Sequence, residues 1–234
     1  MLNRRSLMVG GAALAASAAA ASCASAQMPA PASAGGALLA PKPLPFDPKT
    51  IPGLSEKLLV SHHDNNYAGA VKRLGDIEGQ LRATDFATAP GFLINGLKRE
   101  ELMALNSVIL HEAYFASLGK GGSKPGSALG KQLETDFGSH DKWRNEFVGI
   151  GKALGGSSGW VLLSWSPRMG RLVNQWSSDH TLTAADGQVL IALDMYEHAY
   201  HMDFGAKAAA YVDAFMGALD WANADKGFRP IQEL

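Results

Sequence analysis

Cysteine is nearly absent from this chain, whose 234 residues include only Cys23. Cys23 lies in an N-terminal segment that we expect to be removed, so the mature chain is predicted to have no thiol. Disulfides, thiolate metal sites and cysteine nucleophiles are then excluded. Charge is sparse and balanced, with 18% charged residues and a net charge of -1. This balance gives no indication of a nucleic-acid or anionic-membrane partner, and no apolar run is long enough to predict a membrane span.

The first 26 residues have the pattern of an export signal. Arg4 and Arg5 precede an Ala-rich run that ends in Ala24-Ser25-Ala26, a small-x-small cleavage site ahead of Gln27. Twin arginines before such a run resemble a Tat signal, which predicts a periplasmic protein. Lipoprotein signals end at a cysteine that usually follows a Leu-like residue by three positions, and Ala stands there before Cys23. Lipidation of Cys23 is therefore the less favoured alternative.

Two helices are predicted in the first half of the mature chain. Residues 27–44 are rich in Pro, Ala and Gly and are expected to form a flexible tether. Residues 45–122 are expected to form a helical hairpin domain. Its first helix runs from Leu54 to Arg82, a connector containing one proline and two glycines spans residues 84–96, and the second helix runs from about Lys98 to Leu118.

Residues 123–234 are predicted to form a C-terminal α/β domain. Two short helices are expected near residues 127–137 and 141–154. Three strands are expected at residues 160–165, 171–176 and 189–193, forming a small antiparallel sheet, and a final helix at residues 206–222. Two long helices followed by a sheet with flanking helices indicate an α+β fold.

The segment from Asp194 to Tyr200 contains the most informative residues. An apolar strand, residues 189–193, leads directly to Asp194, and His198 follows four residues later in a turn or first helical turn. A carboxylate and an imidazole placed together at the end of a buried strand suit a first-row metal ion. The alternative is an Asp that caps a helix in which a His happens to occur.

Two further histidines lie on the predicted helices. His62 is on the first helix, and His111 lies in the second within an apolar stripe of 4, 3, 4, 3 spacing. A lone His in such a stripe is also compatible with a core position. Together with Asp194 and His198 they offer three imidazoles and one carboxylate, a mixed N/O donor set that suits iron or manganese.

At these residues the sequence resembles the iron/manganese superoxide dismutases, over essentially the whole mature chain. Residues 194–200 match the family's Asp-x-Trp-Glu-His-Ala-Tyr signature with Tyr196 in the Trp place. Residues 156–160 match its glycine–serine–tryptophan turn, and residues 110–115 its second-helix ligand segment. Ungapped alignment favours His62 over its neighbour His63 as the first ligand.

The resemblance implies a metal site between an N-terminal helical hairpin and a C-terminal α/β domain. His62, His111, Asp194 and His198 would hold one iron or manganese ion, which disproportionates superoxide to oxygen and hydrogen peroxide. Asp194 would balance the metal charge. Glu197 of one subunit would hold ligand His198 of another, which implies at least a homodimer.

Several positions depart from the family pattern. Asn66 replaces a His, Ala70 replaces the gateway Tyr, and His201 replaces the second Tyr after the signature. These positions form the substrate entrance and proton relay in the family. We hypothesise that Tyr67 and His201 partly rebuild the relay.

A histidine is also predicted to act beside the metal. The family places a Gln beside the metal-bound solvent, from the second helix or from the sheet. Ser107 is too short for this role, and the sheet position aligns with His180, which could donate the same hydrogen bond or lie in a solvent-facing loop.

Three readings remain open from the sequence. The favoured one is an exported superoxide dismutase. A metal-binding protein on the same fold with little dismutase activity is the alternative, because the entrance is altered. A cofactor-free helical structural protein is the third. The sequence does not choose iron over manganese or a dimer over a tetramer.

Overall fold

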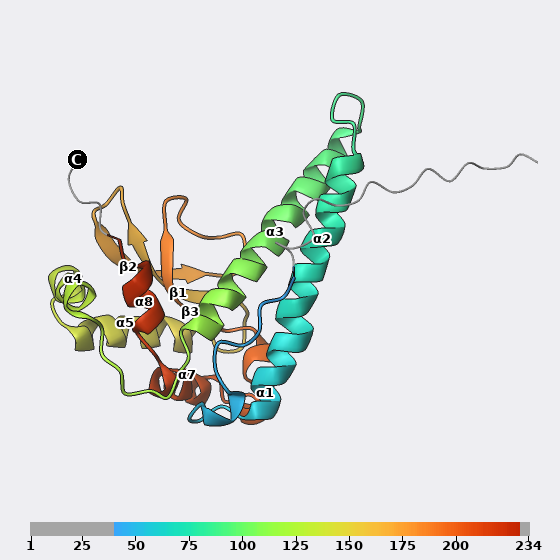
Figure 1. The fold of residues 1–234 in the computed structure, drawn as a ribbon. Coiled ribbons are helices and arrows are strands. Elements are labelled where there is room, and N and C mark those ends of the chain that lie inside the picture. The colour runs from blue at the N-terminus through green and yellow to red at the C-terminus, as the bar shows by residue number, and fades with distance from the viewer. Residues whose placement is uncertain (1–39, 230–234) are drawn as a thin grey trace, which may run out of the picture. The chain divides into compact units, whose positions relative to one another are not determined.

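The computed structural model describes residues 40–229, which belong to one compact unit (Figure 1). The predicted signal at residues 1–26, Cys23 and most of the predicted tether lie outside the described residues. Within residues 40–229, no helix combines the length and the apolar character that crossing a membrane requires. The hairpin and the sheet belong to the same compact unit. The predicted boundary between two domains near residue 122 stays a prediction.

A long helical hairpin forms the N-terminal part (Figure 1). After a 3-10 turn at Pro48–Thr50, its first arm comprises α1 (Glu56–Ser61), a π-helical turn, η2 (His62–Tyr67), and α2 (Ala68–Ala83). Ser55 caps this arm by accepting a hydrogen bond from the Leu58 amide. The predicted helix therefore has nearly the expected extent, but residues 62–67 form a π-helical turn instead of α-helix.

The second arm, α3 (Gly91–Ala116), begins seven residues earlier than expected. The connector predicted over residues 84–96 was wrong beyond Pro90. The amides of Leu93 and Ile94 donate to the Pro90 carbonyl and start the helix there. The two glycines that suggested a loop, Gly91 and Gly96, instead lie at the start and in the second turn of α3. A Cβ added at either position would have no neighbour within 4 Å.

The C-terminal part consists of a small sheet and the helices beside it. Helices α4 (Ser127–Phe137) and α5 (His140–Ala153) precede strands β1 (Trp160–Ser166), β2 (Arg171–Ser177) and β3 (Gln188–Asp194). The three strands pair antiparallel, as predicted, and their order in the sheet is β2-β1-β3. Short helical turns η3 (Glu197–Ala199) and α6 (His201–Phe204) follow, and then α7 (Ala208–Ala218) and α8 (Ala222–Gly227). The α+β fold class is confirmed.

The single final helix predicted over residues 206–222 was wrong, because the chain breaks between α7 and α8. At this break Gly119 donates to the Ala218 carbonyl and Asp220 donates to the Ser117 carbonyl, both at 2.9 Å. These bonds join the end of α3 to the end of α7. Backbone pairing with a distant segment therefore replaces helical bonds at residues 219–220.

The core lies around β1, the central strand, in which every residue is buried. β3 packs directly against α3, and the amide of Ala192 donates to the Ser117 hydroxyl. This packing sets the end of β3, where Asp194 lies, against the helical hairpin. The sheet edge and the hairpin together define the candidate site.

Candidate metal centre

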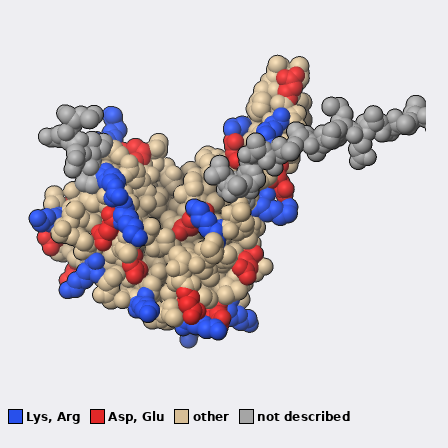
Figure 2. Space-filling view, in the orientation of Figure 1, with Lys and Arg blue, Asp and Glu red and all other residues tan. Residues whose placement is uncertain are grey.

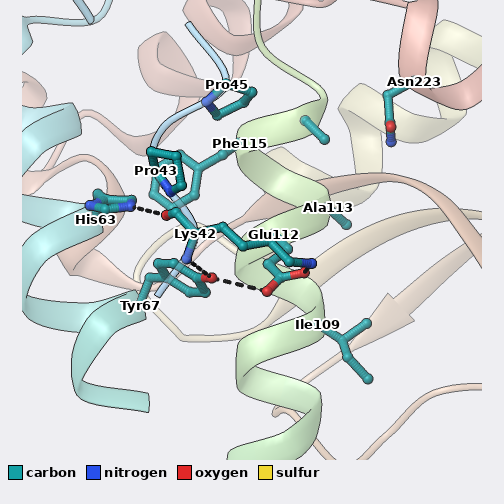
Figure 3. A pocket seen from close by; sticks show the side chains of 11 residues that line it. Lys42, Pro43, Pro45, His63, Tyr67, Ile109, Glu112, Ala113, Phe115 and Asn223 are labelled. Carbon is teal, nitrogen blue, oxygen red and sulfur yellow. Dashed lines mark hydrogen bonds and ion pairs between the residues drawn. The ribbon is translucent and has the colours of Figure 1, made fainter. Parts of the chain in front are cut away.

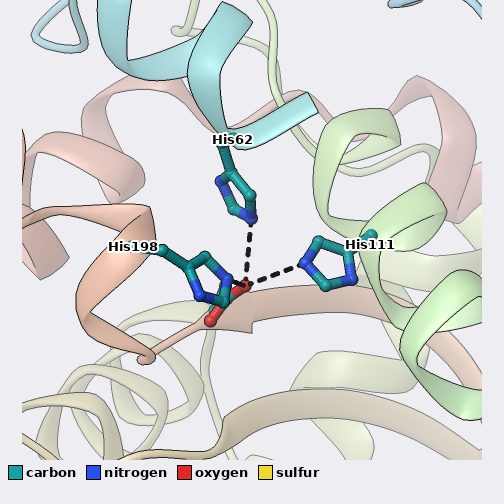
Figure 4. A group of neighbouring side chains, drawn as sticks. His62, His111 and His198 are labelled. Atoms are coloured by element: carbon teal, nitrogen blue, oxygen red, sulfur yellow. Dashed lines mark hydrogen bonds and ion pairs between the residues drawn. The ribbon is translucent and has the colours of Figure 1, made fainter. Parts of the chain in front are cut away.

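Four side chains from four elements bring their donor atoms together (Figure 4). His62 comes from η2, His111 from α3, Asp194 from the end of β3 and His198 from η3. Their ligand atoms all lie within 4.8 Å of one another. The Asp194 Oδ2 atom lies 3.2, 3.7 and 3.1 Å from the Nε2 atoms of His62, His111 and His198. All four residues predicted as metal ligands therefore meet at one point.

Local backbone structure orients two of these groups. The π-helical turn contains one extra residue per turn, which changes the direction in which its side chains point, and such turns often occur at functional sites. It buries His62 completely and leaves His63 to bond the Lys42 carbonyl instead. Asp194 pairs with Trp160 at the end of the β1–β3 ladder, and its Oδ1 accepts from the Tyr196 amide at 2.8 Å. The structure thus supports His62 rather than His63.

The hydrogen bonds around His111 leave one ring nitrogen available. Its Nδ1 lies 2.7 Å from the Ser107 carbonyl oxygen, which can only accept, so Nδ1 carries the proton and donates. The Nε2 atoms of His62 and His111 are buried and have no hydrogen-bond partner. Buried polar atoms without a partner are costly, and a bound metal ion would satisfy these nitrogens. The donor set fits a single iron or manganese ion.

The protonation states suit metal binding as well. Burial lowers the pKa of His62, and it lowers the pKa of His111 to about 3. Burial alone would raise the pKa of Asp194, but the neighbouring imidazoles of His198 and His62 outweigh it and lower this pKa. Neutral imidazoles and an ionised carboxylate are the forms that coordinate a metal.

A cavity of about 320 Å³ is lined in part by the ligand residues His111 and His198. Asn66 and Ala70 line it, at the two positions where the family has a His and the gateway Tyr. The missing aromatic side chain leaves this part of the wall to an alanine. The altered entrance expected from the sequence therefore lies directly over the site.

His180 lines the same cavity and its ring is held in place. The Trp160 indole Nε1, which can only donate, lies 2.9 Å from His180 Nδ1. In neutral His180 the proton is therefore on Nε2. The ring stacks on Tyr196 at 4.9 Å, and its centroid lies 6.2 Å from that of His111. Burial lowers the pKa of His180, which favours this neutral form.

Tyr67 and His201 lie away from this cavity. The Tyr67 hydroxyl accepts from the Lys42 amide and donates to the Glu112 carboxylate, beside a different cavity of about 360 Å³ (Figure 3). Lys42 also pairs with Glu112 through its ammonium group. His201 is exposed on α6. The last residues of the predicted tether are thus held against the hairpin, and the structure does not bring Tyr67 and His201 together at the metal ligands.

Arg73 was missed from the sequence. It lines the cavity over the ligands together with Asn66 and Ala70. These three residues follow a spacing of four and three along one helical face, and this spacing could have identified it.

Comparison with known proteins places these observations in a family. Residues 125–227 match the C-terminal domain of iron/manganese superoxide dismutases. An iron superoxide dismutase of Cupriavidus metallidurans is 63% identical over 187 residues, or 80% of this chain and 94% of that protein. A manganese superoxide dismutase of Halobacterium salinarum is 32% identical over 82% of this chain and 95% of its own length. An iron superoxide dismutase of Aquifex aeolicus is 32% identical over 77% of this chain and 87% of its own length. The resemblance seen in the sequence is confirmed, and the chain belongs to the iron/manganese superoxide dismutase family.

Proposed function

We propose that this protein is a superoxide dismutase that uses one iron or manganese ion per chain. The observation that carries the proposal is the convergence of three imidazoles and one carboxylate within 4.8 Å. A relative that is 63% identical is named an iron superoxide dismutase, and others are named manganese enzymes. Two superoxide ions and two protons yield one oxygen and one hydrogen peroxide.

A bound iron or manganese ion would supply the one-electron chemistry of this reaction. His62, His111, Asp194 and His198 would hold it, and the Ser107 carbonyl and the Tyr196 amide fix His111 and Asp194. Asp194 compensates part of the metal charge. The cavity beside His111 and His198 gives the small anionic substrate access to the site.

The test is superoxide turnover of the chain from Gln27 onward, reconstituted separately with iron and with manganese, with metal quantified on the same sample. Fast turnover with either metal supports the enzyme and names its cofactor. Full metal occupancy with negligible turnover contradicts it, and favours a metal-binding protein whose altered entrance at Ala70 prevents catalysis.

We assign His180 as the hydrogen-bond donor to solvent bound at the metal. The Trp160 bond places the His180 proton on Nε2, and the ring lines the cavity beside His111. We expect His180→Ala to lower turnover by about 10- to 100-fold and to shift the reduction potential of the metal, while metal content stays near that of the parent. Potentiometric titration and metal analysis measure this. An unchanged potential would mean that His180 is only a wall residue.

Tyr67 and His201 are proposed to assist proton supply. Tyr67 reaches Glu112, which neighbours ligand His111 in the chain, and His201 is open to solvent. A Tyr67→Phe, His201→Ala double variant should lower turnover by about 10-fold or less at high substrate, where proton supply limits the rate. Pulse radiolysis at several substrate concentrations measures it. Unchanged turnover would contradict the relay.

A homodimer through Glu197 and His198 is also proposed. Glu197 is exposed and the His198 side chain is 26% exposed, so both can reach a second subunit. Sedimentation equilibrium should give a dimer for the parent and a shift toward monomer for Glu197→Ala. A monomeric parent would contradict the proposal.

Export to the periplasm by the Tat route is proposed from the twin arginines, Arg4 and Arg5. Export after folding would allow metal insertion in the cytoplasm. Cell fractionation of the parent and of an Arg4→Lys, Arg5→Lys variant tests it, since the variant should stay in the cytoplasm. An N-terminus at Gln27 in the exported form would also argue against lipidation of Cys23. Basic and acidic side chains lie among each other on the face in Figure 2.

A further inference from the structure

The cavity over the metal ligands contains one permanently cationic side chain. Among the described residues that line it, Arg73 is the only Lys or Arg, and no carboxylate lines it. The lining also includes the neutral side chains of Asn65, Asn66 and Met103. The volume of about 320 Å³ is large compared with a diatomic anion. Shape alone therefore does little to retain such a substrate, and charge matters more.

The Arg73 side chain is paired with Glu100, a residue from the other arm of the hairpin. Its guanidinium on α2 pairs with the Glu100 carboxylate on α3, while the two side chains stay 56% and 37% exposed. Glu100 does not line the cavity. Burial and the charge of His198 do most to lower the pKa of His180, and the charge of Arg73 adds a smaller lowering, which places this charge within electrostatic range of the cavity interior.

We propose that Arg73 captures the anionic substrate at the mouth of the cavity, and that Glu100 weakens this capture by competing for the guanidinium. The proposal rests on the proposed dismutase function. Arg73 would then determine how fast the substrate enters the cavity. It would take over part of the role of the gateway Tyr, whose position is occupied by Ala70 in this chain. A cleft lined by charge of one sign raises the association rate of an oppositely charged ligand, and salt weakens the effect by screening the charges.

The size of the effect follows from exposure. Because both side chains are more than a third exposed, solvent and salt screen their charges. We expect Arg73→Ala to lower kcat/KM about two- to five-fold at low ionic strength and to leave kcat unchanged. Glu100→Gln should raise kcat/KM by about two-fold, because the guanidinium loses its competitor. Both differences should vanish near 1 M salt, where the Debye length is about 3 Å.

Two further variants separate charge from structure. Arg73→Lys keeps the positive charge and should restore most of kcat/KM, whereas a purely structural role of the guanidinium would not be rescued. Arg82→Ala is the matched control, because Arg82 is an exposed arginine of the same helix that pairs with Glu78 and does not line the cavity. It should behave like the parent at every salt concentration.

A binding measurement on the metal-loaded protein completes the test. Azide, a small monovalent anion, is titrated at low ionic strength and followed by absorbance, so that anion affinity is read apart from turnover. Arg73→Ala should weaken azide binding and Glu100→Gln should strengthen it. A parent without turnover defeats the proposed function itself. An active parent whose kcat/KM and azide affinity do not respond to Arg73→Ala overturns the capture role alone.

Discussion

Replacing Asp194 by Asn is expected to abolish stoichiometric metal binding and to lower superoxide turnover by more than about 100-fold. The reason is that the change removes the carboxylate charge from the group of four ligands, while the amide keeps nearly the same shape and can still accept from the Tyr196 amide. Loss of groups that merely orient a metal ligand costs about 10- to 100-fold, so loss of a ligand costs more. Metal analysis and turnover on the same sample measure both effects.

A stability measurement distinguishes loss of the metal from loss of the fold. A ligand that binds only the folded state raises its stability, so metal addition should raise the Tm of the parent protein but not that of Asp194→Asn. Asp213→Asn is the control, because Asp213 is an exposed carboxylate that pairs with Lys152 on the surface, and it should keep both metal and turnover. Full metal content and turnover in Asp194→Asn would contradict the ligand set.

Asp194 and His111 were accessible from the sequence because each lies on or directly after a strongly patterned element, and the resemblance to the family supplied the full ligand set. The apolar strand before Asp194 and the stripe around His111 place both side chains in the interior, and the structure buries both. The choice between His62 and His63 was harder, since both lie on one helix. It depends on a π-helical turn, which helical periodicity alone does not reveal.

Contacts between distant segments were much less accessible. The break after α7 follows from backbone bonds to residues 117 and 119, about a hundred positions earlier in the chain. The pairing of Lys42 with Glu112 and that of Arg73 with Glu100 likewise join segments whose proximity no local pattern encodes. The position of Tyr67 beside Lys42, rather than over the metal ligands, has the same origin. Sequence patterns identify the buried face of a helix or strand, whereas tertiary packing decides which segment contacts that face.

The turn before β1 gives the largest expected effect on stability. Gly159 has φ +138°, a conformation that favours glycine, and an added Cβ would lie 2.0 Å from the Ser177 carbonyl oxygen. Its own carbonyl accepts from the Met195 amide at 2.9 Å, directly after ligand Asp194. Backbone strain and the clash together should make Gly159→Ala destabilising by about 3–5 kcal/mol, measured by denaturant unfolding.

The control for this prediction is Gly149→Ala. Gly149 is exposed within α5 and a Cβ there meets nothing within 4 Å, so this change should stabilise by about 0.5–1 kcal/mol. Because the Gly159 carbonyl accepts from the amide of Met195, the residue after Asp194, metal affinity should fall in Gly159→Ala along with stability, whereas Gly149→Ala should leave it unchanged. Unfolding of Gly159→Ala at the same denaturant concentration as the parent would contradict this prediction. It would mean that the turn can move away from β2, so that the close approach of β2 to Gly159 does not hold Asp194 in place.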